Sequence, residues 1–224
     1  MKFLALEAMP HAIVHEFVPR VAGVSIGGDR SEVLDRLWPH HFDTIQRLGF
    51  GEANFIRGEQ LHGAEIAVVG RSILSGRIVP GVDGLVTDRP DTLLGIVVAD
   101  CCAVYLVDRE NQAIGLVHSG RRGTELGVVP AALMQMAGTF GSKIANVVVQ
   151  LSPCIRPPDY EVDFADDIRK QCLSAGVPAC QIHDEGLSTA ADLTRFYSYR
   201  AEKGRTGRML ALLGLRSLKC RERD

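Results

Sequence analysis

Five short apolar runs rich in valine and isoleucine, all between residues 65 and 118, constrain the fold of this chain more than any other feature. Runs of this kind predict β-strands, and their lack of polar alternation predicts strands that are buried on both faces. A compact polar turn at residues 108–111 separates the last two runs and predicts a hairpin. That hairpin would bring Cys101 and His118 within reach of each other. The predicted strands are Glu65–Val69, Gly84–Thr87, Leu93–Ala99, Val104–Val107 and Ala113–His118.

Helical spacing of apolar residues predicts helices around these strands. The longest, Asp29–Leu48, has Asp29 and Ser31 as cap candidates, Pro39 as a point of bending or breaking, and Gly49 as its end. The remaining predictions are a helix Thr124–Ala137 that packs through Leu126, Val129, Leu133 and Met136, a strand Val147–Leu151, a helix capped by Asp163 that runs to Ala175, and a short helix Arg208–Leu213.

This order of elements predicts an α/β (α+β) fold, a mixed β-sandwich with flanking helices. No internal repeat, low-complexity tract or charge-rich linker divides the 224 residues, so we expect a single domain over residues 1–224. Nothing in the sequence resembles a Gly-rich dinucleotide fingerprint or a P-loop.

Charge and composition favour a small-molecule partner. The formal net charge of -2 gives no general attraction to nucleic acid or to anionic lipid, and no apolar run is long enough to span a membrane. Glu7 and Pro10 interrupt the apolar stretch at the N-terminus before a signal-peptide core develops, so we expect a cytoplasmic protein with reduced thiols. The cysteines are Cys101, Cys102, Cys154, Cys172, Cys180 and Cys220.

Three residues are candidate metal ligands. His62 precedes Gly63 in a predicted loop, and taken alone it is more often a surface or hydrogen-bonded histidine than a ligand. Cys101 lies where a predicted buried strand ends, and because neighbouring strand residues point to opposite faces, we assign Cys101 to the site and Cys102 to packing. His118 ends another predicted strand.

One thiolate and two imidazoles suit Zn²⁺, with copper as the alternative, and leave a fourth position for water, phosphate or substrate. The Gly-flanked basic loop after His118 could hold an anion through its backbone N–H groups and Arg122, although Arg121 and Arg122 could equally be solvated surface charges. Asp100 is a candidate general acid or base, and it could equally be a strand-end residue that accepts backbone hydrogen bonds.

Several ordered motifs resemble the multicopper-polyphenol-oxidase (laccase-domain) family. QLHG contains His62, DGLVTDRPDTLLGIVVADC ends at Cys101, and AIGLVHSGRRGTELGVV contains His118. SPCIRPPDYEVD and DLTRFYSYRAEKGRTGRMLALLGL are similar to the later blocks of that family. The resemblance covers nearly the whole chain, from about Val14 onward.

The resemblance implies a zinc-dependent purine nucleoside phosphorylase that acts on adenosine, inosine or methylthioadenosine, with adenosine deaminase activity and a fold similar to that of a toxin-type cysteine hydrolase. A peptidoglycan-editing role is also attached to bacterial members. The metal triad of the family corresponds to His62, Cys101 and His118, with Cys101, Arg122 and Asp100 as catalytic residues and Arg122 and Gln60 as substrate-binding residues. The chain departs from the family at Arg121, which replaces a tryptophan, at Ala103, which replaces a proline, and at Ser152, which replaces a glycine.

Two other readings use the same residues. Cys101 as nucleophile and His118 as its base would give a cysteine hydrolase or amidase that acts on a peptide-like cell-wall substrate. A non-catalytic metal-binding protein would keep the site without the activity. Copper-dependent polyphenol oxidation is a weaker reading, because several copper ions need more histidines than the seven present could gather.

Overall fold

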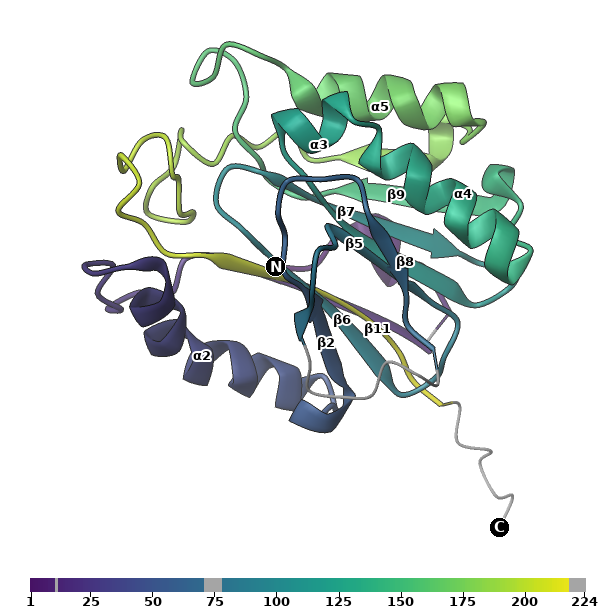
Figure 1. Cartoon of the computed structure of the whole chain (residues 1–224), viewed down its shortest axis with the longest axis horizontal. Coiled ribbons are helices and arrows are strands. Elements are labelled where there is room, and N and C mark those ends of the chain that lie inside the picture. The colour runs from purple at the N-terminus through teal and green to yellow at the C-terminus, as the bar shows by residue number, and fades with distance from the viewer. Residues whose placement is uncertain (11, 71–77, 218–224) are drawn as a thin grey trace.

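Two mixed β-sheets are stacked face to face, and helices cover the outer face of each sheet (Figure 1). The computed structural model describes residues 1–10, 12–70 and 78–217. This architecture confirms the predicted α+β sandwich with flanking helices. The extent of a single domain over residues 1–224 stays a prediction. Among the described helices, none is both long enough and apolar enough to cross a membrane.

One sheet has five strands and the other has six. The five-stranded sheet has the order β1 (Ile13–Val18), β11 (Met209–Leu215), β6 (Thr92–Val98), β2 (Phe55–Gly58) and β4 (Ile78–Val79). The six-stranded sheet has the order β10 (Ile182–Asp184), β9 (Val147–Leu151), β7 (Cys102–Asp108), β8 (Ala113–Ser119), β5 (Gly84–Thr87) and β3 (Ile66–Val68). β7 and β8 pair antiparallel with Cys102 opposite Ser119, as the predicted hairpin requires.

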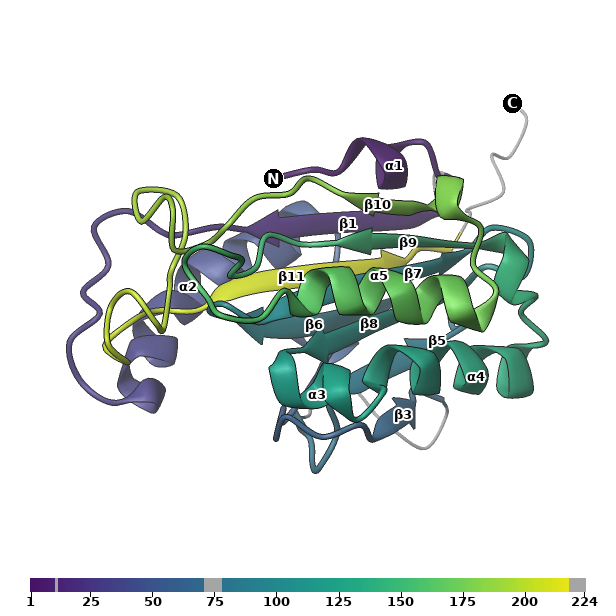
Figure 2. The same ribbon diagram turned by 90° about the horizontal axis from the view of Figure 1, so that it is seen from above.

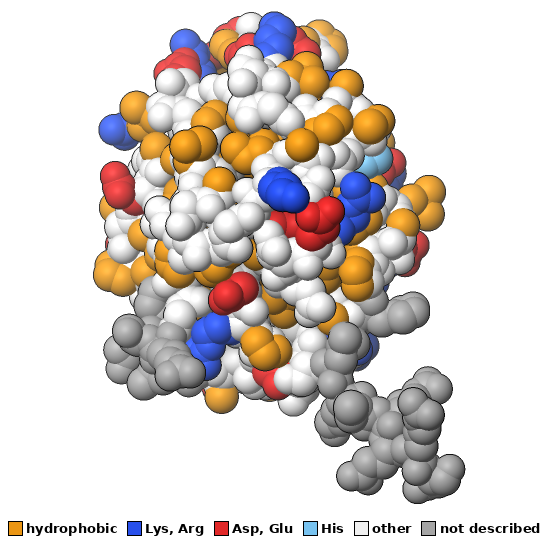
Figure 3. All heavy atoms as spheres, turned by 90° about the vertical axis from the view of Figure 1, so that its right-hand side faces the viewer, with side chains coloured by type: hydrophobic (Ala, Val, Ile, Leu, Met, Phe, Trp, Pro, Cys, Tyr) orange, Lys and Arg blue, Asp and Glu red, His pale blue; other side chains and the backbone are white. Residues whose placement is uncertain are grey.

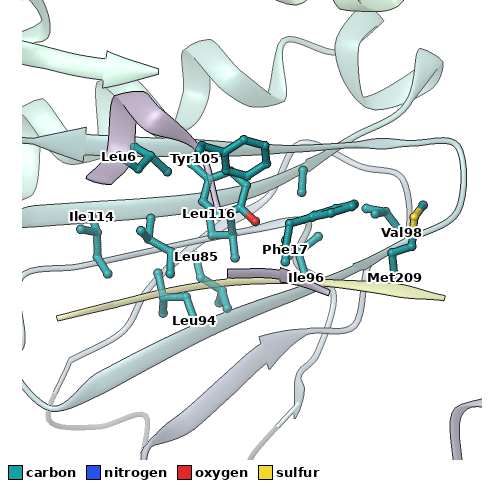
Figure 4. Close-up of a cluster of buried hydrophobic side chains, with 14 of the residues drawn as sticks. Leu6, Phe17, Leu85, Leu94, Ile96, Val98, Tyr105, Ile114, Leu116 and Met209 are labelled. Atoms are coloured by element: carbon teal, nitrogen blue, oxygen red, sulfur yellow. The ribbon is translucent and has the colours of Figure 1, made fainter. Parts of the chain in front are cut away.

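The main hydrophobic core fills the space between the two sheets. Strand residues alternate between this core and the outer layers, so that Leu94 and Ile96 of β6 point inward while Leu93 of the same strand points toward the helix on the far side. Figure 4 shows Phe17 and Tyr105, one from each sheet, among the aliphatic side chains that fill the space. Both faces of the central strands are therefore covered, which explains why their sequences lack polar alternation.

Helix α2 (Arg30–Arg47) covers the five-stranded sheet (Figure 1). Asp29 accepts a hydrogen bond from the backbone N–H of Glu32, whose side chain accepts one from the backbone of Asp29, and this capping box confirms the predicted start. Pro39 lies inside the helix without ending it, and Gly49 follows the helix with φ of 82°.

Helices α3 (Arg121–Glu125), α4 (Val128–Phe140) and α5 (Phe164–Ala175) lie over the six-stranded sheet, as Figure 2 shows from above. Asp163 caps α5 as predicted, since its side chain accepts the backbone N–H of Asp166. The shorter elements are α1 (Leu4–Glu7) and the 3₁₀ turns η1 (Glu52–Asn54), η2 (Ile144–Asn146) and η3 (Ala179–Gln181).

The predicted C-terminal helix Arg208–Leu213 is wrong, because Met209–Leu215 forms the strand β11. All seven residues of β11 are buried, and a short run that is apolar on every side carries no periodicity to separate strand from helix. The predicted helix Thr124–Ala137 is interrupted at Gly127, whose φ of 76° lies in the left-handed region, and Leu126 is 54% exposed instead of packed. Strand β3 lies at a sheet edge and is only half-buried.

The close approach of β6 to Phe55 gives a test of this packing. A Cβ at Gly95 would lie 2.4 Å from Cε2 of Phe55, so Gly95→Ala should lower the free energy of unfolding by about 1–3 kcal/mol through overpacking. Gly138→Ala is the matched control, because Gly138 lies in helix α4 with open space around its Cβ, and it should raise that free energy by about 0.5–1 kcal/mol. Urea denaturation measures both. Equal stabilities for the two variants would contradict the packing described here.

Candidate metal centre

Three side chains meet where the chain passes between the two sheets. His62 lies in the connection from β2 to β3, and Cys101 lies in the connection from β6 to β7. Both connections leave the five-stranded sheet at the same end because β2 and β6 are parallel. His118 lies near the end of β8, beside the start of β7. The ligand atoms of these three residues all lie within 4.8 Å of one another.

His118 is held by a buried carboxylate. The Nδ1 atom of His118 lies 2.8 Å from Oδ1 of Asp83, and both side chains are buried. A carboxylate accepts hydrogen bonds, so Nδ1 carries a proton and Nε2 is the nitrogen that remains available to a metal ion. The rings of His62 and His118 are 4.8 Å apart at their centroids and almost perpendicular.

The same carboxylate also holds the loop that carries His62. Its oxygens accept the backbone N–H groups of Leu61, His62 and Gly63 at 2.7–3.1 Å. Gln60 and His62 have φ of 68° and 61°, a left-handed conformation that costs a non-glycine residue about 1–2 kcal/mol. The three hydrogen bonds to Asp83 offset that cost.

Asp83 is not among the predicted site residues, although its DGLVT context contains a signal. A carboxylate directly before a fully buried strand needs hydrogen-bond donors, because an unpaired buried charge is costly.

Charge pairing changes the pKa of each member of this group. Burial raises the pKa of Cys101, but His118 and His62 together outweigh burial and lower it to about 6. Burial lowers the pKa of His118, but the Cys101 thiolate and Asp83 raise it to about 9. Burial raises the pKa of Asp83, but the hydrogen bonds from His118 and Gly63 bring it below the ordinary value. Between about pH 6 and 9 the metal-free site therefore holds a thiolate beside an imidazolium.

Gly120 leaves room for the sulfur. A Cβ at this position would lie 2.5 Å from Sγ of Cys101 and 3.8 Å from Cδ2 of His62. The backbone of Gly120 is extended, with φ of -97° and ψ of -174°, and any residue can adopt this conformation. The glycine is therefore required by the close approach of the thiol and not by the backbone.

These donors suit a metal ion. Imidazole nitrogen and thiolate sulfur are the ligands that zinc prefers, and copper accepts the same set. Three protein ligands leave one tetrahedral position open, which is typical of catalytic zinc. The residues present thus fit one zinc ion. Of the histidines in the described ranges, only His62 and His118 line the adjoining cleft, which is too few for several copper ions.

The three candidate ligands lie on the wall of a cleft of about 1000 Å³. The cleft is bordered by the start of α2, the N-terminal end of α3 and the segment that leads into β11. Its lining includes the basic residues Arg30, Arg121, Arg200, Lys203 and Arg208 and the aromatic residues Tyr160, Phe164 and Tyr199. On the opposite end of the molecule, which faces the viewer in Figure 3, Lys and Arg side chains are scattered among acidic and hydrophobic ones.

The structure does not bring Arg122 to this cleft. Its side chain is exposed, and the cleft is lined by Arg121 instead. Arg121 donates to Glu125 at 3.0 Å and lies 3.9 Å from Glu161, which also pairs with Arg200. The first residue of α3 therefore points toward the cleft and the second does not.

Asp100 and Gln60 line the cleft, but their polar atoms are bonded to the fold. The carboxylate of Asp100 accepts the hydroxyl of Thr189 and the backbone N–H of Arg200, both at 2.7 Å. The amide of Gln60 bonds to both the N–H and the carbonyl of Val97. These hydrogen bonds hold the backbone around the site, and the catalytic role of Asp100 and the substrate-binding role of Gln60 stay predictions.

Cys102 points away from the cleft into the core under α4 and α5, next to Cys154 and Cys172. The cysteines in the described ranges are all free, and Cys220 lies outside those ranges.

The chain matches a family model described as multi-copper polyphenol oxidoreductase laccase over residues 23–165 and 162–216. A protein of Geobacillus stearothermophilus named purine nucleoside phosphorylase YlmD is 30% identical over 87% of this chain and 82% of its own length. A purine nucleoside phosphorylase of Deinococcus radiodurans is 30% identical over 94% of this chain and 92% of its own length. The crystal structure of YlmD from Geobacillus stearothermophilus superposes with a TM-score of 0.82 at 26% identity, covering 96% of this chain and 94% of that one.

Replacing Asp83 tests whether it organises the centre. Asp83→Asn keeps the shape of the side chain but removes the charge, and we expect zinc affinity to fall about 10–100-fold, the usual effect of losing a partner of a metal-bound histidine. Asp108→Asn is the control, because Asp108 is equally buried but caps a distant turn, and zinc affinity should not change. Competition with a chromophoric chelator measures both. Equal losses in the two variants would mean that Asp83 only stabilises the fold.

The pKa of Cys101 gives a second test in metal-free protein. A thiolate reacts with iodoacetamide and a thiol does not, so alkylation of Cys101 should rise with pH around a midpoint of about 6. Mass spectrometry of the peptide follows the reaction, with exposed Cys180 in the same sample as the comparison and Cys101→Ser as the control for assignment. A midpoint near 9 would show that the histidines do not act on the sulfur.

Proposed function

The chain belongs to the multi-copper polyphenol oxidoreductase laccase family, and we propose that it is a zinc-dependent purine nucleoside phosphorylase. The observation that carries the proposal is an open set of three ligands on the wall of a basic, aromatic-lined cleft. Relatives named purine nucleoside phosphorylase support this choice. The substrates proposed are adenosine, inosine or methylthioadenosine, together with phosphate.

The reaction is a displacement at C1′ of the ribose. An oxygen of hydrogen phosphate bonds to C1′ while the bond from C1′ to N9 breaks, and its electron pair goes to the purine, which takes the proton of the phosphate. The products are free base and ribose 1-phosphate, or 5-methylthioribose 1-phosphate when methylthioadenosine is the substrate. The cleft contributes positive charge for the phosphate and the flat faces of Tyr160, Phe164 and Tyr199 for the purine.

His62, Cys101 and His118 would hold the zinc ion, which supplies a Lewis acid with one position open to the reactants. Asp83 holds the ring of His118 through Nδ1, so that Nε2 is the nitrogen available to the metal. Asp100 and Gln60 fix the backbone of two cleft walls. We include adenosine deamination as a second reaction of the same centre.

A cysteine hydrolase is the second candidate, and one observation favours it. Asp83, His118 and Cys101 form a carboxylate, imidazole and thiol series, and the pKa of Cys101 is lowered to about 6, as a cysteine nucleophile requires. This candidate would cleave an amide in a peptidoglycan-related substrate. Zinc at near one ion per chain would occupy the thiolate and exclude the nucleophile role.

Chromatography of nucleoside reactions tests the proposal. Zinc-loaded protein should release hypoxanthine from inosine only when phosphate is present. Cys101→Ala should lower the rate of release at least about 100-fold, because the substitution removes one of three ligands that act together. Cys180→Ala is the control, because Cys180 is exposed and lies outside the cleft, and its rate should equal that of the unaltered protein. Zinc-loaded protein that neither releases base nor deaminates adenosine would refute the proposal.

A further inference from the structure

Two arginines on the cleft wall come from segments far apart in the sequence. Arg30 is the first residue of α2, and Arg208 directly precedes β11. The start of α2 and the segment leading into β11 lie side by side in both ribbon views (Figures 1 and 2). Both side chains line the same cleft as Cys101 and His118.

Neither arginine has an acidic partner. The ion pairs of the described residues include neither Arg30 nor Arg208. The nearest acidic neighbour in the sequence, Asp29, uses its carboxylate to cap α2. Within the described part of the chain, the guanidinium of Arg208 donates only to the carbonyls of Thr206 and Gly207, at 3.3 and 2.9 Å. These two bonds fix its position and leave its remaining N–H groups available.

The other arginines of the cleft differ in this respect. Arg121 and Arg200 both pair with Glu161, and Arg121 also pairs with Glu125. Their charges are therefore largely balanced at the rim. Arg30 and Arg208 are thus the cleft arginines without a carboxylate partner among the described residues, and Lys203 likewise makes no ion pair there.

An unpaired, half-buried guanidinium beside a second one is unfavourable unless an anion joins them. The pKa of Arg208 is lowered, first by burial and then by Arg30, which places the two charges within electrostatic reach. The Cys101 thiolate and Asp100 act on Arg208 in the opposite sense. Arg30, Arg208 and the candidate metal ligands line the same cleft.

We propose that Arg30 and Arg208 form the binding site for inorganic phosphate, in place of Arg122. Two guanidinium groups that line one cleft without acidic partners suit a tetrahedral dianion, which can accept paired hydrogen bonds from each. The proposal rests on the proposed function, because phosphorolysis consumes phosphate. It also places that phosphate in the same cleft as the candidate metal ligands.

Phosphate binding without nucleoside tests the site independently of catalysis. Isothermal titration of zinc-loaded protein with inorganic phosphate should show binding that Arg30→Met and Arg208→Lys each weaken roughly 10–100-fold, the usual effect of losing charge-assisted hydrogen bonds. Arg30→Met is the safer variant for folding, because Arg30 is exposed. Arg47→Met is the control, since Arg47 lies at the other end of α2, and its phosphate affinity should not change.

The outcomes separate the two proposals. Arginine-dependent phosphate binding without release of base would support the site and refute the phosphorylase. Phosphate affinity that is absent, or that Arg30→Met and Arg208→Lys leave unchanged, would overturn the site even if the protein is an active phosphorylase. A third arm uses inosine 5′-monophosphate, and arginine-dependent binding of this ester without binding of free phosphate would also overturn the proposal.

Discussion

The candidate site depends on one buried carboxylate. Asp83 accepts hydrogen bonds from His118 and from three consecutive backbone N–H groups of the loop that carries His62. The backbone of Asp83 is also hydrogen-bonded on both sides. Its carbonyl accepts the N–H of His118, and its N–H donates to the carbonyl of Glu65. His62 and His118, which lie far apart in the sequence, are thereby fixed relative to each other. Without this anion, the left-handed loop and the buried imidazole would both lose their support.

The sandwich supplies the rigidity around that carboxylate. The candidate ligands lie at the ends of strands or in short connections between the two sheets, where packed cores on both sides restrict movement. Gln60 continues the hydrogen bonding of the sheet past the end of β2. Its side-chain amide bonds to the N–H and the carbonyl of Val97, as the backbone of a neighbouring strand would. Side chains on such supports hold their geometry better than side chains on long loops. The basic and aromatic residues of the cleft come instead from the first residues of α2, α3 and α5 and from the connections that lead into α5 and β11.

The sequence was informative where local pattern and burial agree. Buried runs located strands β5 to β9, and the period of two correctly separated Cys101 from Cys102. Pattern failed for β11, because an apolar heptapeptide fits a buried helix as well as a buried strand. It could not assign the arginines either, since whether Arg121 or Arg122 points toward the cleft depends on the turn at which α3 begins. The partners of Asp83 and Arg208 are distant in sequence, so no local spacing reveals them.

The extended backbone at Gly120 has a consequence for reading other sequences. Folding alone would tolerate alanine or serine there, because the conformation is ordinary for any residue. Only the volume of the neighbouring sulfur excludes a side chain. A glycine at the corresponding position in a relative is thus evidence of selection for the metal centre and not for the fold. A relative with a larger residue there would still fold but would lack the space for the thiol and, with it, the activity of the centre.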